Sequence, residues 1–250
     1  MEFKTVFKRY ELKYMITPAQ KEKILEAMSP YMELDEYGRT TIRNIYFDTD
    51  NYRIIRRSIE KPSYKEKLRI RSYTKATESS TVFVELKKKH EKVVYKRRLA
   101  MCEKDAMAWL CGYSPSPLNT QISREIDYFI KFYGKLNPSV FLSYEREAYY
   151  DKSGGDFRVT FDDRILCRNN DVSLCSAVYG EPVLPEGKLL MELKCSGGIP
   201  LWMVRVLSNE HIYKTSFSKY GMAYTLYLNP KRSMANSIEN KEMVANGRIF

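Results

Sequence analysis

The feature that most limits the fold is a strand pattern whose charged face is almost entirely cationic. In residues 64–73, YKEKLRIRSY, apolar Leu68 and Ile70 alternate with charged residues, which is typical of a β-strand with one buried face. The other face carries Lys65, Lys67, Arg69 and Arg71. Like charges side by side repel, and a strand face that meets water usually mixes signs. This face is therefore either an ordinary solvated surface or the binding surface for a strong anion.

Alternating segments recur along the chain and predict a sheet interrupted by helices. The expected strands are residues 7–14, 40–48, 64–74, 82–89, 93–101, 139–150, 157–162 and 188–195. The expected helices are residues 18–32, 104–112, 122–133, 201–210 and 218–227. Thr17 can cap the first helix, and Pro18 fits its first position. Because hairpins or short helical excursions join most strands, we expect an antiparallel sheet and an α+β fold.

The chain has 250 residues, enough for one large domain or two small ones. We expect a single domain over residues 1–228. Residues 229–250 are polar and weakly periodic, so we expect a partly disordered tail. Asp48 and Asp50 follow an expected strand, and we expect them to cap a helix or turn in preference to binding a metal.

The charged strand faces form a set, and most of them are cationic. Three share the format Glu-x-Lys, which places an acid beside a base on one face: Glu11/Lys13, Glu85/Lys87 and Glu192/Lys194. Two architectures fit: an open sheet whose charged face meets water, and a closed barrel that turns the charges inward under a coat of helices. The repeated arginines and the recurring carboxylates favour the barrel. A carboxylate beside cations suits a site that binds both a metal ion and phosphate oxygens.

The net charge and the residue types of the chain limit the classes of ligand that it can bind. The net charge of +11 favours polyanions such as nucleic acids, anionic membranes or phosphates. Nucleic acid fits poorly, because the cations alternate along strands and no zinc-finger, helix-turn-helix or RNP pattern occurs. No run of 18 apolar residues predicts a membrane segment, and no apolar signal segment opens the chain, so we expect a cytoplasmic protein. The chain has two histidines and five scattered cysteines, too few and too dispersed to favour a histidine-based metal or acid–base site, a zinc site or a disulfide framework.

Several segments, in their order and spacing, resemble the triphosphate tunnel metalloenzyme superfamily, which is also called CYTH-like. They are FKRYELKY, RNIYFDTDNYRI, YKEKLRIRSY, VFVELKKK, VVYKRRLAM, LSYEREAYYD, DFRVTFDDRI, LLMELKC and SFSKYGMAY. Within the superfamily, residues 3–228 are most similar to the polyphosphate polymerase domain of the vacuolar transporter chaperone (VTC) type. The resemblance implies an eight-stranded, closed antiparallel β-barrel that forms a tunnel, with helices packed on the outside.

The resemblance also implies a reaction: the γ-phosphate of ATP is transferred to a growing inorganic polyphosphate chain, with Mn²⁺ or Mg²⁺ as cofactor. It implies Glu192 as the carboxylate that holds the metal. It implies that the phosphate ligands are Lys13, Arg69, Arg71, Lys87, Lys96, Arg146, Arg158, Ser218 and Lys219. Of these, we expect the catalytic residues to be Arg69, Arg71, Lys87, Arg158 and Lys219. Strand alternation adds Arg98 and Lys194 as substrate ligands, whereas the inward direction of Arg146 comes from the resemblance alone.

One departure from the superfamily bears on the reaction. Its hydrolases and cyclases typically open with Glu-x-Glu-x-Lys, whereas here the matching positions are Arg9, Glu11 and Lys13. The loss of this acid weakens the hypothesis of a hydrolase with two metal ions. In this respect the sequence resembles the polymerase branch of the superfamily. The alternatives are an inorganic triphosphate or polyphosphate hydrolase of the same fold, and a non-catalytic polyphosphate-binding domain that would not need Glu192. The family's regulatory domain is not found in the chain, which leaves room for a separate regulatory protein partner.

Overall fold

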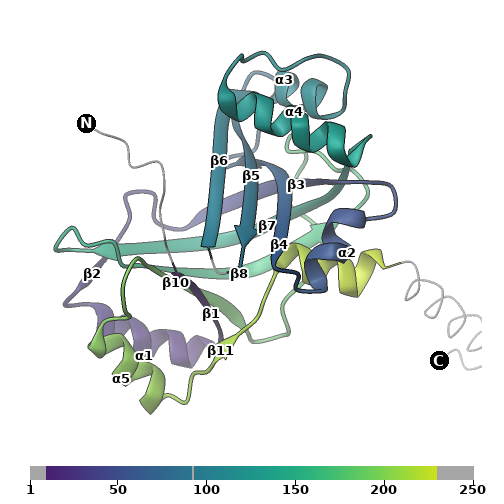
Figure 1. The fold of residues 1–250 in the computed structure, drawn as a ribbon. Coiled ribbons are helices and arrows are strands. Elements are labelled where there is room, and N and C mark those ends of the chain that lie inside the picture. Colours follow the sequence, from purple (N-terminus) through teal and green to yellow (C-terminus); the bar gives the residue numbers. More distant parts are fainter. Residues whose placement is uncertain (1–9, 92, 230–250) are drawn as a thin grey trace, which may run out of the picture.

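The computed structural model describes residues 10–91 and 93–229 (Figure 1). Its elements in chain order are β1 Tyr10–Ile16, α1 Pro18–Met28, β2 Met32–Leu34, β3 Thr40–Asp48, α2 Arg53–Ile59, β4 Tyr64–Ser72, β5 Thr81–His90, β6 Val93–Cys102, α3 Glu103–Leu110, α4 Gln121–Tyr133, β7 Asn137–Asp151, β8 Arg158–Arg168, β9 Glu181–Pro182, β10 Leu189–Cys195, α5 Leu201–Asn209, β11 Lys214–Thr215, α6 Lys219–Ala223 and a π-helical turn, η1, Tyr224–Leu228.

The expected strands and helices are all present, with ends that differ by a few residues. The last expected helix is divided into α6 and η1. The sequence patterns missed helix α2 and the short strands β2, β9 and β11. Arg9, the start of the first expected strand and the expected tail beyond Asn229 lie outside the described residues.

The strands form one antiparallel sheet, and the prediction of an eight-stranded closed barrel is wrong in two respects. The sheet has 11 strands, in the order β11-β1-β10-β8-β7-β3-β4-β5-β6, with β2 beside β7 and β9 beside β8. Within the described residues, β6 pairs only with β5, so the sheet stays open. At the other edge, β11 pairs with β1 over two residues, and the chain then leaves the sheet to form α6.

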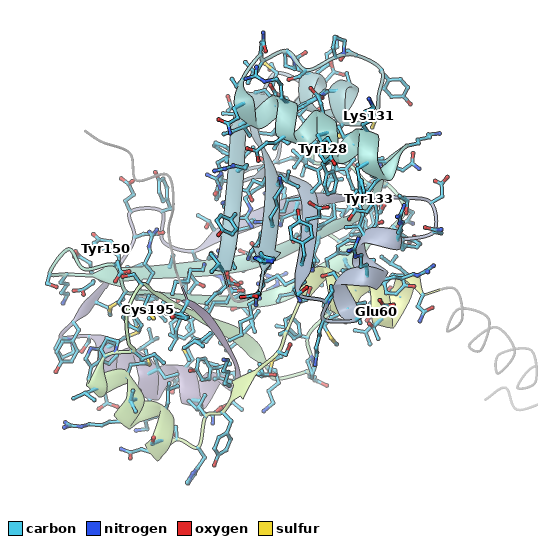
Figure 2. The ribbon with its side chains drawn as sticks, viewed as in Figure 1. Glu60, Tyr128, Lys131, Tyr133, Tyr150 and Cys195 are labelled. Carbon is cyan, nitrogen blue, oxygen red and sulfur yellow. The ribbon has the colours of Figure 1, made fainter. Side chains whose placement is uncertain are left out.

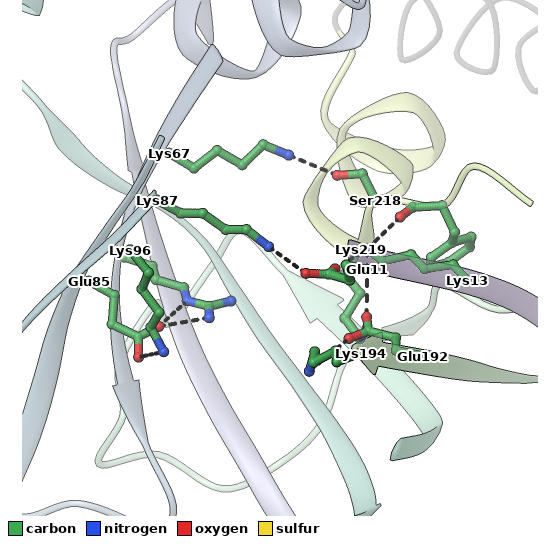
Figure 3. A network of polar contacts seen from close by, with 12 residues as sticks. Glu11, Lys13, Lys67, Glu85, Lys87, Lys96, Glu192, Lys194, Ser218 and Lys219 are labelled. Carbon is green, nitrogen blue, oxygen red and sulfur yellow. Dashed lines mark hydrogen bonds and ion pairs between the residues drawn. The ribbon is translucent and has the colours of Figure 1, made fainter. Parts of the chain in front are cut away.

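The open sheet is nevertheless strongly curved, because strands far apart in its order contact each other through side chains. Lys87 on β5 donates a hydrogen bond to Glu11 on β1 across 3.1 Å, although five strands lie between them in the sheet. Figure 3 shows these two walls facing each other. We call the side of the sheet that carries Glu11 and Lys87 the concave face. The expectation that charged residues point inward and apolar residues outward is confirmed for β4 and β5, but on β3 and β7 apolar residues such as Ile42 and Leu142 also face inward.

Helices cover the convex face in two groups (Figure 1). Helices α3 and α4 pack on strands β3 to β6, and helices α1 and α5 pack on β1, β8 and β10. Helix α4 shows the division clearly, because Ile126 and Phe129 are buried whereas Tyr128 and Lys131 face outward (Figure 2). The described helices include none with the length and hydrophobicity needed to span a membrane.

The C-terminal helical segment covers one end of the concave face. Tyr220 and Tyr224 of α6 and η1 are buried in one apolar cluster with Tyr46, Val140 and Leu190 of the sheet. The Tyr46 and Tyr220 rings stack with centroids 4.7 Å apart. This apolar end leaves the rest of the concave face to charged side chains.

Local capping fixes the ends of two helices. Thr17 and Gln20 form a reciprocal capping box at α1, with Pro18 in the first turn, as predicted. Asp48 is fully buried and accepts hydrogen bonds from the backbone amides of Ile54 and Ile55, so its predicted capping role is confirmed. Its second oxygen also accepts from the Tyr220 hydroxyl at 2.9 Å, which ties α6 to α2.

We expect Tyr220→Phe to lower the free energy of unfolding by about 1–3 kcal/mol, because a buried carboxylate loses one of its donors. Urea unfolding followed by circular dichroism measures this change. Tyr213→Phe is the matched control, since Tyr213 is 77% exposed and should change stability by no more than about 0.5 kcal/mol. Equal stability of the two variants would show that the bond to Asp48 contributes nothing to the fold.

Candidate functional site

Two buried carboxylates organise the charged side chains of the concave face. Glu85 lies on the wall formed by β4, β5 and β6, and Glu192 lies on the opposite wall with β1, β8 and α6 (Figure 3). Each is surrounded by cations that the sequence singled out.

Glu85 is 1% exposed and holds three cations in place. The Arg69 guanidinium donates to Glu85 Oε2 from Nε at 2.9 Å and from Nη2 at 2.7 Å. Lys96 Nζ lies 2.7 Å from Glu85 Oε1, and Arg98 Nε donates to that oxygen at 2.7 Å. Burial alone would raise the pKa of Glu85, but Arg69 and Arg71 overcome this effect and hold the pKa well below its usual range.

Glu192 is 6% exposed and is the centre of a second cluster. Lys219 Nζ lies 3.2 Å and Lys13 Nζ 3.6 Å from Glu192 Oε1. Lys194 Nζ lies 3.5 Å and Arg146 Nη2 3.8 Å from Oε2. Burial alone would raise the pKa of Glu192, but Lys219 and Lys13 reverse the direction and keep the carboxylate ionised.

Asp162 extends the Glu192 cluster. It is fully buried and accepts two hydrogen bonds from Arg146, at 2.6 and 2.7 Å. Lys219 Nζ lies 2.5 Å from Asp162 Oδ2, so this lysine bridges Asp162 and Glu192. The two carboxylates together raise the pKa of Lys219, despite its burial, so it stays protonated. The structure thereby places Arg146 on the concave face, the direction that the resemblance implied.

The two clusters belong to one polar interior. Glu11 joins them, because it lies 3.1 Å from Lys87 on one wall and 3.2 Å from Lys13 on the other. A second connection runs through Tyr144, whose hydroxyl accepts from Arg71 Nη2 at 2.8 Å while Lys219 Nζ lies 4.6 Å from its ring centroid. The structure therefore brings Arg71 and Lys219 together on one face.

Two cations of this interior have only neutral hydrogen-bond partners. Arg71 is 7% exposed and donates to Asn44 Oδ1 at 3.0 Å and to Tyr144, with no ion pair to any described residue. Lys67 is half-buried and donates to Ser218 Oγ at 2.8 Å, again without an ion pair in the described part of the chain. Burial and the neighbouring cations, first of them Lys13, lower the pKa of Lys67 to about 7. Buried cations without counter-ions are costly, so the interior is suited to bind an anion.

The remaining expected residues lie at the borders of the interior. Ser218 caps α6 by accepting from the backbone amide of Gly221 and also accepts from Lys67. Arg158 pairs with Lys194 across β8 and β10, but it is exposed and makes no ion pair with the described residues. Arg158 therefore lies at the rim and is the expected site residue least connected to the others.

The structure adds residues that the sequence analysis did not include in the site. Lys67 and Asp162 stand on the same alternating faces as Arg69 and Arg158, so alternation could have identified both. Tyr144 carried no such signal, because it lies in a run of five buried residues, 140–144, where both faces of β7 are covered. Polar and apolar residues therefore do not alternate clearly in residues 141–147, although β7 pairs regularly with β3 over residues 140–146.

The side chains around Glu192 decide whether a divalent metal ion could bind there. The described residues include no group of three or more carboxylate, histidine or cysteine ligands that could hold a metal by itself. However, the buried Thr160 hydroxyl has no hydrogen-bond partner among the described residues, and Thr160 pairs directly with Glu192 across the sheet, on the same face. Mg²⁺ is commonly held by one or two carboxylates together with substrate phosphates. The donor set therefore fits a metal shared with bound phosphate, and does not fit an all-protein metal cage.

The fold and this interior define a class of protein: a curved antiparallel sheet whose concave face carries more cationic side chains than carboxylates, as polyanion-binding folds do. The family model for the VTC domain matches residues 8–228, and the chain belongs to the VTC domain family. A search of curated protein sequences finds no match.

Two solved structures are similar to the chain. A "putative adenylate cyclase" from Bacillus halodurans matches with 15% identity and a TM-score of 0.51, over 84% of this chain and 95% of that one. A second "putative adenylate cyclase", from Vibrio parahaemolyticus, has 10% identity and a TM-score of 0.46, over 88% of this chain and 98% of that one. At such identities the first similarity supports the fold alone.

Proposed function

We propose that this protein is a polyphosphate polymerase, which transfers the γ-phosphate of ATP to a growing inorganic polyphosphate chain. Membership of the VTC domain family supports a function related to polyphosphate or triphosphate. The observation that carries the proposal is the excess of cations on the concave face, where the hydrogen-bond partners of Arg71 and Lys67 within residues 10–91 and 93–229 are neutral. A chain of phosphates supplies many negative charges in a row, which matches a row of cations along several strands.

In this proposal, the cations of the two walls position the phosphates. Arg69 and Arg71 offer planar forks of donors that match phosphate oxygens, while Lys87 and Lys96 act as point charges. Each wall already holds its cations in place through a carboxylate, so little reorganisation is needed when phosphate binds. Lys13, Arg146 and Lys194 would continue the same path along the opposite wall.

A metal ion, Mn²⁺ or Mg²⁺, would be held by Glu192 with the Thr160 hydroxyl nearby, together with phosphate oxygens. When bound, such an ion neutralises charge that develops on the phosphate oxygens during transfer. Lys219 lies between Glu192 and Asp162, and its raised pKa keeps it as a cation beside the transferring group.

The transfer itself requires positioning and charge stabilisation more than covalent chemistry. A terminal oxygen of the polyphosphate chain forms a bond to the γ-phosphorus of ATP as the bond from that phosphorus to the bridging β–γ oxygen breaks. ADP leaves, and the chain is one phosphate longer. No protein nucleophile is needed. An acceptor chain aligned on the basic wall would compete well with water.

Purified protein incubated with ATP and Mn²⁺ tests the proposal, with ADP release followed and the product separated on a gel that resolves polyphosphate. A ladder of long chains is the expected result. ADP and orthophosphate without a ladder would overturn the polymerase in favour of a hydrolase. Absence of turnover, with polyphosphate still bound tightly, would leave a binding domain.

One observation favours the hydrolase as a second candidate. Asp162 adds a second buried carboxylate next to Glu192, and Lys219 joins the two. The Arg9 substitution had argued that this chain is poor in metal-binding acids, but Asp162 offsets part of that loss. Inorganic tripolyphosphate as sole substrate distinguishes the two activities, because the hydrolase releases orthophosphate from it whereas the polymerase needs ATP.

The proposal places the protein in the cytoplasm, where ATP is supplied. ATP and polyphosphate would be its ligands. By analogy with the VTC family, a separate regulatory protein would bind it.

The proposal predicts pH-dependent binding. Burial and nearby cations lower the pKa of Lys67 to about 7, and burial lowers that of Lys194 to about 8. Both lysines are protonated below these values, and bound phosphates would favour the protonated forms. Tripolyphosphate should therefore bind more tightly at pH 6 than at pH 9 and should take up protons near pH 7–8.

Calorimetry in buffers of different ionisation enthalpy measures this proton uptake directly. Lys67→Met should reduce the uptake near pH 7, whereas Lys214→Met, which removes an exposed lysine on β11, should leave it unchanged. Binding that takes up no protons between pH 6 and pH 9 would contradict the role given to Lys67.

A further inference from the structure

The charged row on β4 to β6 ends in aromatic side chains. Tyr73 directly follows the last residue of β4, and its ring lies beside Phe83 and 6.0 Å from the Arg71 guanidinium. Phe83 pairs with Arg71 across β4 and β5, and Ala100 pairs with Phe83 across β5 and β6, so both face the same side. An aromatic group therefore adjoins the cations at the end of these three strands.

These aromatic rings are not part of the apolar core. Tyr73 is 41% exposed, Phe83 is half-buried, and Ala100 is exposed. The neighbours of Phe83 along its strand, Val82 and Val84, point to the opposite face and are fully buried there. Ala100 is the cross-strand neighbour of Phe83, and its small side chain covers little of the ring.

Arg98 links the aromatic group to the phosphate-binding interior. Its guanidinium lies 4.5 Å from the centroid of the Phe83 ring, and its Nη2 donates to the Tyr73 hydroxyl at 2.9 Å. The same guanidinium is bonded to Glu85. The Tyr73 and Phe83 rings meet edge to face, with centroids 5.6 Å apart. Arg98 and the two rings thus form a fixed surface directly beside the Glu85 cluster.

We propose that Tyr73, Phe83 and Arg98 form the subsite for the base of a nucleoside triphosphate whose phosphates lie among the cations of the concave face. This inference rests on the proposed function, in which ATP is the donor. Nucleobases stack on aromatic rings and on arginine guanidinium planes, and they do so largely regardless of base identity. The surface offers stacking and one tyrosine hydroxyl, so purine nucleotides should bind with little discrimination between adenine and guanine.

The test separates the base from the phosphates. Calorimetry measures the affinities of the β,γ-imido analogue of ATP and of inorganic tripolyphosphate for the same protein in Mg²⁺ buffer. In Phe83→Ala and Tyr73→Ala, the affinity for the ATP analogue should fall about 5- to 100-fold, the range expected for one lost base stack. The affinity for tripolyphosphate should stay within about twofold of the wild type.

Two further variants control for indirect effects. Tyr73→Phe keeps the ring and should retain most of the ATP-analogue affinity. Tyr128→Ala removes a 70% exposed tyrosine from α4 on the convex side and should change neither affinity (Figure 2).

Three results would overturn the inference, and they are distinguishable. If both affinities fall together in Phe83→Ala, the rings only position Arg98. If neither falls, the base does not contact this surface. If the wild-type protein binds neither compound, the proposed function itself fails, and the base subsite fails with it.

Discussion

Glu192→Gln is expected to lower ATP-dependent polyphosphate synthesis by about a thousandfold while leaving nucleotide binding in place. A bound metal ion supplies several kcal/mol of charge stabilisation in phosphoryl transfer, and each 1.4 kcal/mol corresponds to about tenfold in rate. The glutamine keeps the shape of the side chain but removes the charge that would hold the ion. Without metal, the β,γ-imido analogue of ATP should bind at least as tightly as to the wild type, because one negative charge near its phosphates is gone.

Initial rates of ADP release with Mn²⁺ measure the loss, and electron paramagnetic resonance of Mn²⁺ with the bound ATP analogue shows whether the ion is still held. Glu181→Gln, which changes an exposed carboxylate on β9, is the control and should keep full activity. If Glu192→Gln keeps both its rate and its Mn²⁺ signal, the metal is not held by Glu192. Asp162, the other carboxylate bonded to Lys219, would then be the first residue to examine.

Sequence alternation identified the walls of this interior because a strand has a period of two residues. Once Leu68 and Ile70 are assigned to the buried face, Arg69 and Arg71 must lie on the other. The same reasoning placed Arg98 and Lys194 beside the carboxylates that they contact. It also applies to Lys67 and Asp162, which alternation could have included.

Closure of the sheet could not be predicted in this way. Strands β9 and β11 have two residues each and show no period, so nothing in the sequence marks them. Helix α2 has seven residues, and a segment that short carries little periodic signal. Whether β6 meets the other edge depends on where the chain leaves the sheet after β11, which is a property of tertiary packing. The curvature of the sheet follows from contacts between distant strands, such as the hydrogen bond between Lys87 and Glu11.

Contacts between distant strands could not be predicted from the sequence either. Tyr144, which connects Arg71 to Lys219, lies in a stretch of β7 that is buried on both faces, so no alternation marked it. The sequence alone is compatible with two roles for Glu11 and Glu85: a second metal ligand, or an interior partner that holds neighbouring lysines and arginines in place. The structure gives Glu85 three cationic neighbours, which favours the role of a partner that holds phosphate-binding cations in place.

That role of Glu85 gives a large expected effect on stability. Glu85→Gln should lower the free energy of unfolding by about 3–5 kcal/mol, because removing one member of a buried ion-pair group leaves uncompensated charges. For a domain of this size, the melting temperature should fall by about 10 °C. Tripolyphosphate should restore much of this loss, since its oxygens can replace the missing carboxylate beside Arg69, Lys96 and Arg98. Thermal unfolding with increasing tripolyphosphate measures both effects.

The convex face offers a matched control for this charge change. Glu125 pairs with Lys88 and Arg97 at 3.4 and 3.3 Å, but it is 23% exposed, so Glu125→Gln should cost no more than about 1 kcal/mol. Ligand binding stabilises a fold by RT ln(1 + [L]/Kd). Because tripolyphosphate should bind more tightly once the competing carboxylate is gone, its shift should be larger for Glu85→Gln than for the wild type or the control. Equal shifts in all three proteins would mean that Glu85 stabilises the fold while the cations around it do not contact phosphate. An unchanged melting temperature in Glu85→Gln would show that the cluster of Arg69, Lys96 and Arg98 is not held by this carboxylate.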